Sequence, residues 1–374
     1  MTQYMTNMNA KTLLNVLERT GHTGVQESKW IGDFLVESNR EEELPMSLRM
    51  LVGVGAALSS CFLLLFLAIS KVIDFDSAFQ LIFWGLVFIA NALLMARRST
   101  SHGLVGHSFF VQTSLCSIGV GKILFTLGCV EMVKDAGHHD LWAANFALLL
   151  ITLVTWHFYK MALDRFLSAF AVMAMLLVNI VFDSSIGAGR EVLMNLYRLG
   201  LIVSAGFFFT HDKMTREFMP AGYAALATLA VTVGLFASKF KIGWGEHALI
   251  LEPFFMNVCL AAALVGLIGW AAGGMKQLAR EPLALAAAGA VLLGLVSAPG
   301  AIFCIGLMVL GYARQEKMLI SGGALAMPYF LWMYYYNMDI TLMAKAGILV
   351  ASGAVLLGGK IYMSARNIGR EDKA

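Results

Sequence analysis

The sequence predicts an all-α membrane protein, a polytopic bundle of about twelve membrane-spanning helices. Two observations predict this class. First, 59% of the 374 residues are hydrophobic and only 14% are charged, whereas a soluble globular chain carries roughly 25% charged residues. The mean hydropathy is accordingly high, at +0.74. Second, apolar runs of about twenty residues recur along the chain, and this is the length that crosses the hydrocarbon core of a bilayer.

Residues 1–46 are polar and charged, and we expect them to form a cytoplasmic helical hairpin. Leu13 and Leu17 belong to one apolar helical stripe. Thr23, with Gln26 three residues later, forms a capping-box pattern that predicts the start of a second helix. The segment is net acidic, whereas docking on anionic lipid requires clustered Lys and Arg. The hairpin is therefore expected to pack on the protein's own cytoplasmic face or on a partner.

Residues 47–374 are predicted to form a transmembrane domain that ends in a short cytoplasmic tail. Five of the six prolines fall at or just before a predicted helix start, where the missing N–H costs nothing. Pro328 alone falls inside a span, and we expect it to kink that helix. The ninth and tenth spans are short, so they also fit a broken or re-entrant pair. The predicted spans are 48–71, 77–96, 106–130, 140–158, 164–182, 193–209, 218–238, 253–272, 282–297, 299–313, 317–335 and 340–363.

Lysine and arginine are distributed unevenly between alternate loops, and this predicts the orientation of the chain. The side that holds the N-terminus carries 19 of the 27 Lys and Arg residues, the opposite side carries six, and two lie within spans. Cytoplasmic loops of membrane proteins are enriched in these residues. Both termini are therefore predicted to lie in the cytoplasm, in agreement with an even number of spans.

Three cations lie deep within predicted spans, namely Lys122, Arg198 and Lys345. The rise of a helix places them roughly 9–14 Å below the outer ends of their spans. A charge at the bilayer centre costs about 2.5–3.5 kcal/mol on insertion scales. Each cation therefore needs a partner, a water-filled cavity or a route to the interface. A carboxylate lies nearer the outer end of each of the same helices: Glu131, Glu191 and Asp339.

The three cations belong to polar stripes, and such stripes on spanning helices face protein or water rather than lipid. One hypothesis is therefore an outward-facing cationic cavity for an anionic ligand or a lipid headgroup. The alternative is that each cation extends outward and pairs with the carboxylate of its own helix. The candidate ligand-binding residues are Gln112, Lys122, Arg198, Glu252, Asp339, Thr341 and Lys345.

The outer loops contain acidic and histidine residues, for which metal binding or acid–base chemistry competes with ordinary solvated polarity. No pair follows a metal-ligand spacing such as His-x-x-x-His, and no Cys-x-x-Cys pair is present. The sequence therefore predicts no metal, no cofactor and no catalytic residue. A net charge of +3 gives no indication of nucleic-acid binding. The loop residues considered are Glu131, Asp135, His138, His139, Asp140, Glu246, His247 and Glu252.

The C-terminal third carries a run of recognisable motifs. Ala298-Pro299-Gly300 opens a helix, Gly311-Tyr312-Ala313-Arg314 follows, and Tyr334-Tyr335-Tyr336-Asn337-Met338-Asp339-Ile340-Thr341-Leu342 precedes Lys345 and Gly353. With these motifs the chain resembles the bacterial membrane family called domain of unknown function 4401, over about residues 48–363. The resemblance implies a bacterial inner membrane and a membrane or periplasmic partner with a GDYxxLxY motif. It implies no activity and no catalytic residues.

Three functions are consistent with these features. The first is a transporter-like or ligand-handling protein, which requires a water-accessible path to Lys122 or Lys345. The second is a non-catalytic partner or anchor of another envelope protein, which requires a solidly packed bundle with an exposed apolar patch. The third is an enzyme acting on a lipid-linked substrate, which requires a carboxylate or histidine in a groove open to lipid. No Walker A sequence is present, which argues against direct ATP coupling in this chain.

Overall fold

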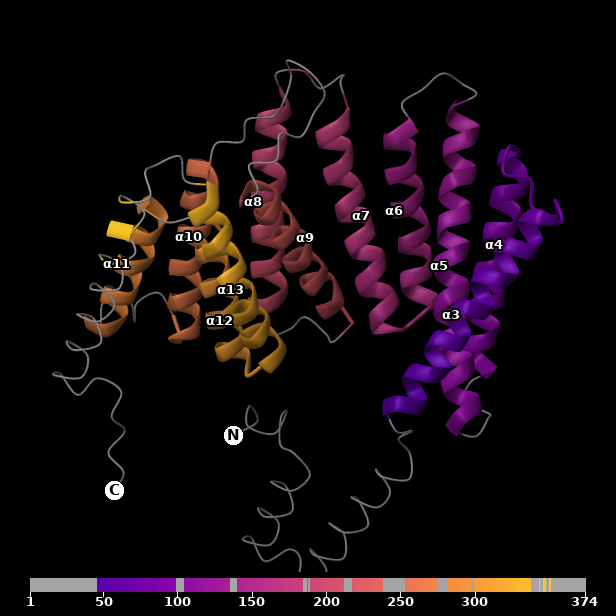
Figure 1. Ribbon diagram of the computed structural model, residues 1–374, viewed down its shortest axis with the longest axis horizontal. Coiled ribbons are helices and arrows are strands. Elements are labelled where there is room, and N and C mark those ends of the chain that lie inside the picture. Colours follow the sequence, from indigo (N-terminus) through magenta and orange to yellow (C-terminus); the bar gives the residue numbers. More distant parts are fainter. Residues whose placement is uncertain are drawn as a thin grey trace, which may run out of the picture. The chain divides into compact units, whose positions relative to one another are not determined.

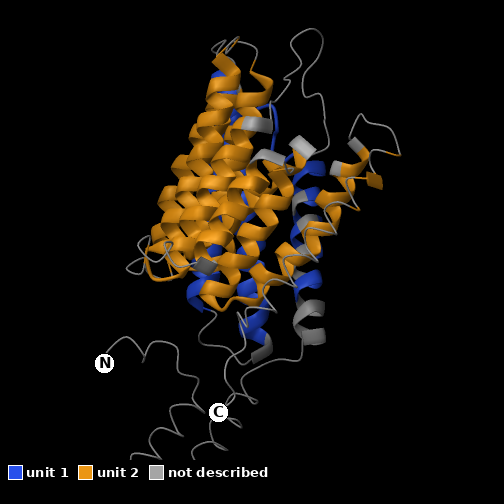
Figure 2. Ribbon diagram, turned by 90° about the vertical axis from the view of Figure 1, so that its left-hand side faces the viewer, with its two compact units in different colours: residues 1–136 blue, residues 137–374 orange. Residues whose placement is uncertain are grey.

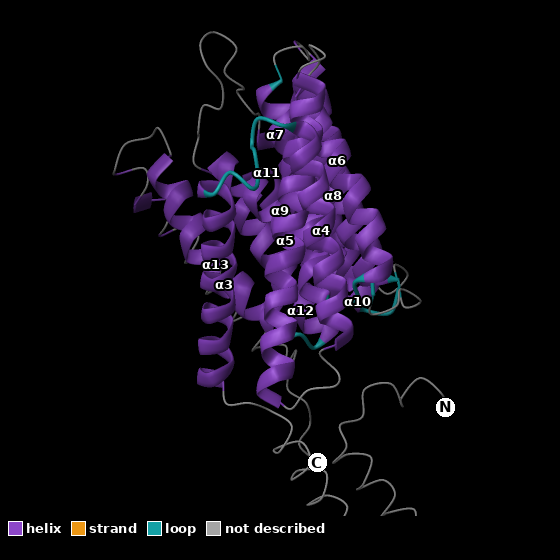
Figure 3. Cartoon of the chain, turned by 90° about the vertical axis from the view of Figure 1, so that its right-hand side faces the viewer, coloured by secondary structure: helices purple, strands orange, loops and turns teal. Residues whose placement is uncertain are grey.

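The computed structural model is helical throughout its regular elements. It describes residues 46–98, 104–134, 140–183, 187, 189–211, 217–237, 253–274, 281–296, 299–337, 343, 346–347 and 350. Eleven helices are present in these residues, joined by turns and loops (Figures 1 and 3). Contacts divide the chain into two compact units, residues 1–136 and 137–374 (Figure 2).

The eleven helices match the first eleven predicted spans to within a few residues at each end. The all-α class is thus confirmed for the part of the chain that the structure describes. Pro328 lies inside a helix, as predicted. The predicted twelfth span, 340–363, lies outside the described residues except at four positions. The predicted hairpin at 1–46 also lies outside them, except for its last residue.

Five of the helices are long and apolar enough to cross a membrane, and they indicate a membrane protein. Several others are apolar but shorter, including two of 16 residues each that correspond to the ninth and tenth predicted spans. The five long segments are Ala78–Arg98, Gly106–Lys134, Leu141–Phe158, Ala162–Phe182 and Arg190–Thr210.

Unit 1 contains α3 (Met46–Ile69), α4 (Ala78–Arg98) and α5 (Leu104–Lys134). The backbones of α4 and α5 come very close together. A Cβ added at Gly85 would lie 2.7 Å from the Phe125 nitrogen, and one added at Gly121 would lie 2.8 Å from the Gly85 oxygen. Ser117 also donates a hydrogen bond of 2.9 Å to the Phe88 carbonyl. Small residues at the crossing therefore set the distance between these two helices, as is common in membranes.

Unit 2 contains α6 (Asp140–Phe158), α7 (Ala162–Phe182), α8 (Arg190–Thr210), α9 (Met219–Ala237), α10 (Pro253–Ala271), α11 (Glu281–Val296), α12 (Pro299–Arg314) and α13 (Lys317–Asn337). Helix α9 contacts α7, α8, α12 and α13, and α10 contacts α8, α11 and α12. The largest apolar core cluster includes Leu229 of α9, Met256 of α10 and Ile302 of α12. The core of unit 2 thus lies among α8, α9, α10 and α12.

The two faces of α8 show an arrangement suited to lipid. A soluble protein turns charged and polar residues toward solvent on such a helix. In α8 the large apolar side chains are on the exposed side and a charge is on the buried side, which is expected of a helix surrounded by lipid. The exposed apolar residues are Val192, Leu196, Leu199 and Val203. The buried residues are Met194, Arg198, Leu201, Ala205 and Phe209.

Candidate functional site

Arg198 is among the largest fully buried side chains in the described part of the chain, at 1% exposed. It lies on the buried stripe of α8. Its Nη1 donates a hydrogen bond of 3.1 Å to Asn195 Oδ1, one turn earlier on the same helix. Side chains on a helix lean toward its N-terminus, which favours this i, i−3 contact. A neutral amide oxygen thus orients the guanidinium while its positive charge stays within the bundle.

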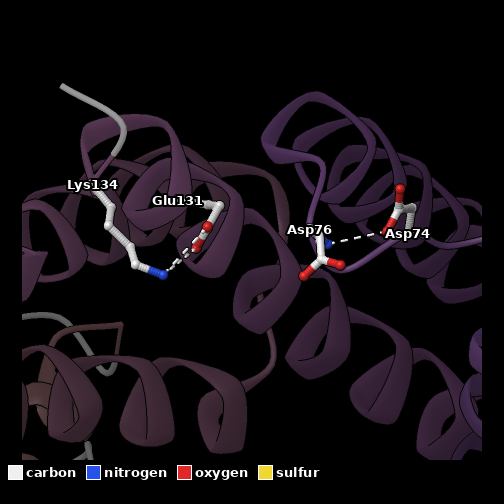
Figure 4. Close-up of polar contacts among 4 residues, drawn as sticks. All are labelled: Asp74, Asp76, Glu131 and Lys134. Carbon is white, nitrogen blue, oxygen red and sulfur yellow. Dashed lines mark hydrogen bonds and ion pairs between the residues drawn. The ribbon is translucent and has the colours of Figure 1, made fainter.

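Two of the carboxylates considered as partners of the deep cations lie elsewhere. Glu191 is exposed at the start of α8, and Asn195 occupies the position next to Arg198. Glu131 forms an ion pair of 3.4 Å with Lys134 at the end of α5 (Figure 4). In the same unit, the Asp76 backbone N–H donates to Asp74 Oδ1 at 3.2 Å (Figure 4). Glu131 therefore pairs with Lys134, the nearest cation at the end of its helix, rather than with the deeper Lys122.

Lys122 is also buried, at 5% exposed, within unit 1. It lies about 100° around α5 from Gly121, so it is not on the face that packs closely on α4. Gln112 of the same helix faces α3, where its Oε1 is 3.3 Å from a Cβ built at Gly53. Lys122 belongs to unit 1 and Arg198 belongs to unit 2. The other candidate ligand residues, Glu252, Asp339, Thr341 and Lys345, lie outside the described residues.

A partly enclosed cavity of about 270 Å³ lies in unit 2 between α8, α9, α10 and α12. Its walls are apolar, and Thr210 is the only polar side chain among the described residues that line it. The Thr210 hydroxyl donates to the Gly206 carbonyl at 2.7 Å, so this group is satisfied within its own helix. The cavity therefore offers dispersion contacts and no hydrogen-bonding side chain. Arg198, the candidate ligand residue that the structure describes in this unit, is not among the residues that line it.

Three glycines from three helices keep this space open. Gly206 of α8, Gly266 of α10 and Gly306 of α12 all line the cavity, and a Cβ added at any of them would meet nothing within 4 Å. At Gly300 of the same unit the glycine instead marks a close approach, since an added Cβ would collide with the Phe330 ring. The sequence gives the positions of these glycines, but whether a glycine marks a contact or an empty space depends on which helix faces it.

Polar groups hold the helix ends together beside the cavity. Arg314, at the end of α12, donates from Nε to the Phe209 carbonyl at 2.7 Å, and Phe209 lines the cavity. The Arg314 guanidinium also lies over the Trp270 ring, 5.4 Å from its centroid. Two residues further on, Glu316 accepts a hydrogen bond from the Tyr223 hydroxyl. Burial raises the pKa of the Glu316 carboxyl above its ordinary value. We refer to Arg314, Trp270, Tyr223 and Glu316 as the inner clamp.

A similar arrangement occurs at the end of α6. Arg165 donates to the Trp156 carbonyl at 3.0 Å and to the Glu217 carbonyl at 3.4 Å. Its guanidinium lies 5.3 Å from the centroid of the Trp156 ring, which stacks on Phe218. The last carbonyls of a helix lack partners within that helix. Both arginines supply donors to such carbonyls and a cation to an aromatic face.

No group of three His, Cys, Asp or Glu side chains that could hold a metal ion is found among the described residues. Four of the five cysteines, Cys116, Cys129, Cys259 and Cys304, are free thiols.

The helices, their exposed apolar faces and the buried charge together define a helical membrane protein. The chain belongs to the family described as Domain of unknown function (DUF4401), whose model matches residues 45–365. This match confirms the resemblance carried by the motifs of the C-terminal third. No curated protein and no solved structure matched the chain.

Proposed function

We propose that this chain is a multi-pass protein of the bacterial inner membrane, with both termini in the cytoplasm, that handles a ligand within unit 2. The excess of Lys and Arg on alternate loops supports the orientation. The five long apolar helices and the exposed apolar side of α8 support insertion in lipid. The family resemblance supports the bacterial inner membrane.

The observation that carries ligand handling is the cavity of about 270 Å³. Protein interiors are close-packed, with few voids larger than a water molecule. An apolar cavity of this kind does not hold water well, because water needs two or more polar partners. The occupant expected inside a membrane is therefore an apolar chain. The proposal therefore assigns the apolar part of the ligand to the space between α8, α9, α10 and α12, where the sequence alone led us to expect a polar cavity.

The class of ligand follows from the size of the cavity. Typical small-molecule pockets enclose roughly 300–1,000 Å³, so a cavity of about 270 Å³ suits one flexible chain better than a bulky ring system. We assign the chain to transporter-like or ligand-handling proteins on this basis. An anchoring role for a GDYxxLxY protein is the alternative, and co-purification of such a protein regardless of the cavity would favour it.

Filling the cavity tests this proposal. The variant Gly206→Phe places a large side chain in the cavity, where a Cβ meets nothing within 4 Å. Gly200→Phe is a matched control, because Gly200 on the same helix also has open space around it but does not line the cavity.

We expect native mass spectrometry of the detergent-purified protein to show a co-purified lipid-sized adduct on the wild type and on Gly200→Phe. We expect Gly206→Phe to lack it. A wild type without any adduct, or an equal adduct on all three proteins, would contradict the proposal.

A further inference from the structure

Arg198 and the cavity share one face of α8. The cavity is lined on this helix by Ile202, Ala205, Gly206, Phe209 and Thr210. Arg198 precedes Ile202 by four residues and Ala205 by seven, which is the spacing of one helical face. The rise of a helix places the Arg198 backbone about 6 Å beyond Ile202, toward the proposed outer side. A ligand chain lying along this face of α8 would therefore have one end directed at the guanidinium.

The guanidinium is suited to an anionic headgroup. It is 1% exposed, so its charge acts in a low dielectric, where electrostatic attraction is stronger than in water. Asn195 Oδ1 accepts a hydrogen bond of 3.1 Å from it, which orients the guanidinium. Its planar set of N–H donors matches the geometry of carboxylate and phosphate oxygens.

The opposite end of the cavity is less suited to an anion. The Arg314 guanidinium there already lies on the Phe209 carbonyl and over the Trp270 ring. The Glu316 carboxyl adds acidic character two residues further on. The two ends of the cavity thus differ in polarity, which favours a ligand with a single anionic end.

We propose that the ligand is a single-chain anionic amphiphile, with its carboxylate or phosphate headgroup bound by Arg198 and its acyl chain in the glycine-lined cavity. This inference rests on the proposed function, because it assigns the headgroup of the ligand whose chain fills the same cavity. It also gives a role to the charge that the bundle buries on α8.

A matched pair of probes tests this assignment. Dibromostearic acid and dibromostearyl alcohol carry the same brominated chain, which quenches tryptophan fluorescence, and differ in the charge of the headgroup. Trp270 packs in the cluster that includes the cavity residues Phe209 and Leu310. Binding is therefore measured as the part of the fluorescence quenching that comes from Trp270, which is the part that disappears in the variant Trp270→Phe. A lysophosphatidic acid competitor distinguishes a phosphate from a carboxylate headgroup.

We expect the wild type to bind the acid at least about tenfold more tightly than the alcohol, as one charge-assisted hydrogen bond would give. Arg198→Gln should abolish this ratio without changing the affinity for the alcohol, and Arg198→Lys should keep most of it. Gly206→Phe should weaken both probes.

Equal affinities of the wild type for acid and alcohol would overturn the headgroup assignment and leave the cavity ligand in place. This comparison needs no variant, so it holds even where Arg198→Gln fails to fold. An unchanged ratio in a folded Arg198→Gln protein would also overturn it. Binding of neither probe to the wild type would overturn the proposed function as well.

Discussion

Arginine side chains at two helix ends combine a carbonyl and an aromatic ring in the same way. Arg314 contacts the Phe209 carbonyl and Trp270, and Arg165 contacts the Trp156 carbonyl and the Trp156 ring. Both arginines lie on the proposed cytoplasmic side. Arginines that contribute to the proposed orientation therefore also stabilise the ends of helices.

Replacing Arg314 should measure this contribution. We expect Arg314→Gln to lower the free energy of unfolding by about 2–3 kcal/mol, because a hydrogen bond from a charged donor and a cation–π contact are both lost. Lys317→Gln is the control, since Lys317 is exposed in the next turn. Thermal unfolding of the purified proteins in one detergent gives the comparison. Equal melting temperatures for the two variants would show that the clamp contributes little.

Glu316 should make stability depend on pH. Its pKa is raised by burial, so the folded state favours the protonated carboxyl. That contribution is complete below the unfolded-state pKa of about 4.3 and is lost as pH rises through the folded-state pKa. We therefore expect Glu316→Gln, which resembles the protonated form, to gain melting temperature relative to the wild type as the pH rises above about 4.3. Tyr223→Phe removes the donor to Glu316 and should steepen the loss. A difference independent of pH would show that this carboxyl does not titrate in the range.

The candidate site could be predicted from the sequence only in part. Burial of Arg198 and Lys122 was predictable, because long apolar runs on both sides place them inside the membrane. The hydrogen-bond partner of Arg198 was not predictable from the sequence. Asn195 and Glu191 both lie on the same side of the helix as Arg198, and the structure shows the bond to Asn195. The cavity was not predictable, because an empty space depends on which faces of four helices meet.

Among the helices, glycine has two opposite roles, and a pair of substitutions separates them. A Cβ at Gly85 would lie 2.7 Å from the Phe125 nitrogen, whereas one at Gly119 would meet nothing within 4 Å. We expect Gly85→Ala to destabilise the protein by about 1–3 kcal/mol through overpacking. Gly119→Ala should be neutral or stabilising by up to about 1 kcal/mol, because alanine favours the helix. Detergent melting temperatures that change equally in both variants would contradict this distinction.

The turn between α12 and α13 contains a strained residue. Gln315 has a φ of 59°, in the left-handed region that suits glycine. The following residue, Glu316, donates its backbone N–H to the Gly311 carbonyl at 2.8 Å, which is the pattern of a Schellman motif. We expect Gln315→Gly to stabilise the protein by about 0.5–1 kcal/mol, because it relieves this strain. Gln315→Ala serves as the control and should bring no such gain in melting temperature.

The positions of the helices were predictable because apolar length alone sets them in a membrane. The predicted and observed helix ends agree within a few residues. This holds also for the helix that contains Pro328 and for helices that are separated by only a short turn. Which helices pair was not predictable, because faces such as that of Gly85 and Gly121 differ little in sequence from lipid-facing ones.

The whole molecule should have the orientation that its basic residues indicate. Lys134 is exposed at the end of α5, and Lys160 is exposed just after the end of α6; the sequence predicts that these two loops lie on opposite sides of the membrane. In a cysteine-free background, a membrane-impermeant maleimide added to intact cells with a permeable outer membrane should label Lys134→Cys. It should label Lys160→Cys only after the inner membrane is opened. The reverse pattern would invert the proposed topology.

The inner clamp also sets an order of events during synthesis. Arg314 follows Phe209 by 105 residues, and Glu316 follows Tyr223 by 93. Arg165, by contrast, follows Trp156 by only nine, so its cap on α6 is available almost as soon as α7 begins to emerge. The carbonyl of Phe209 at the end of α8 gains its arginine partner only after four further helices, α9 to α12, have been made. A nascent chain halted before α12 would therefore hold the walls of the cavity on three sides, with neither α12 nor the clamp in place.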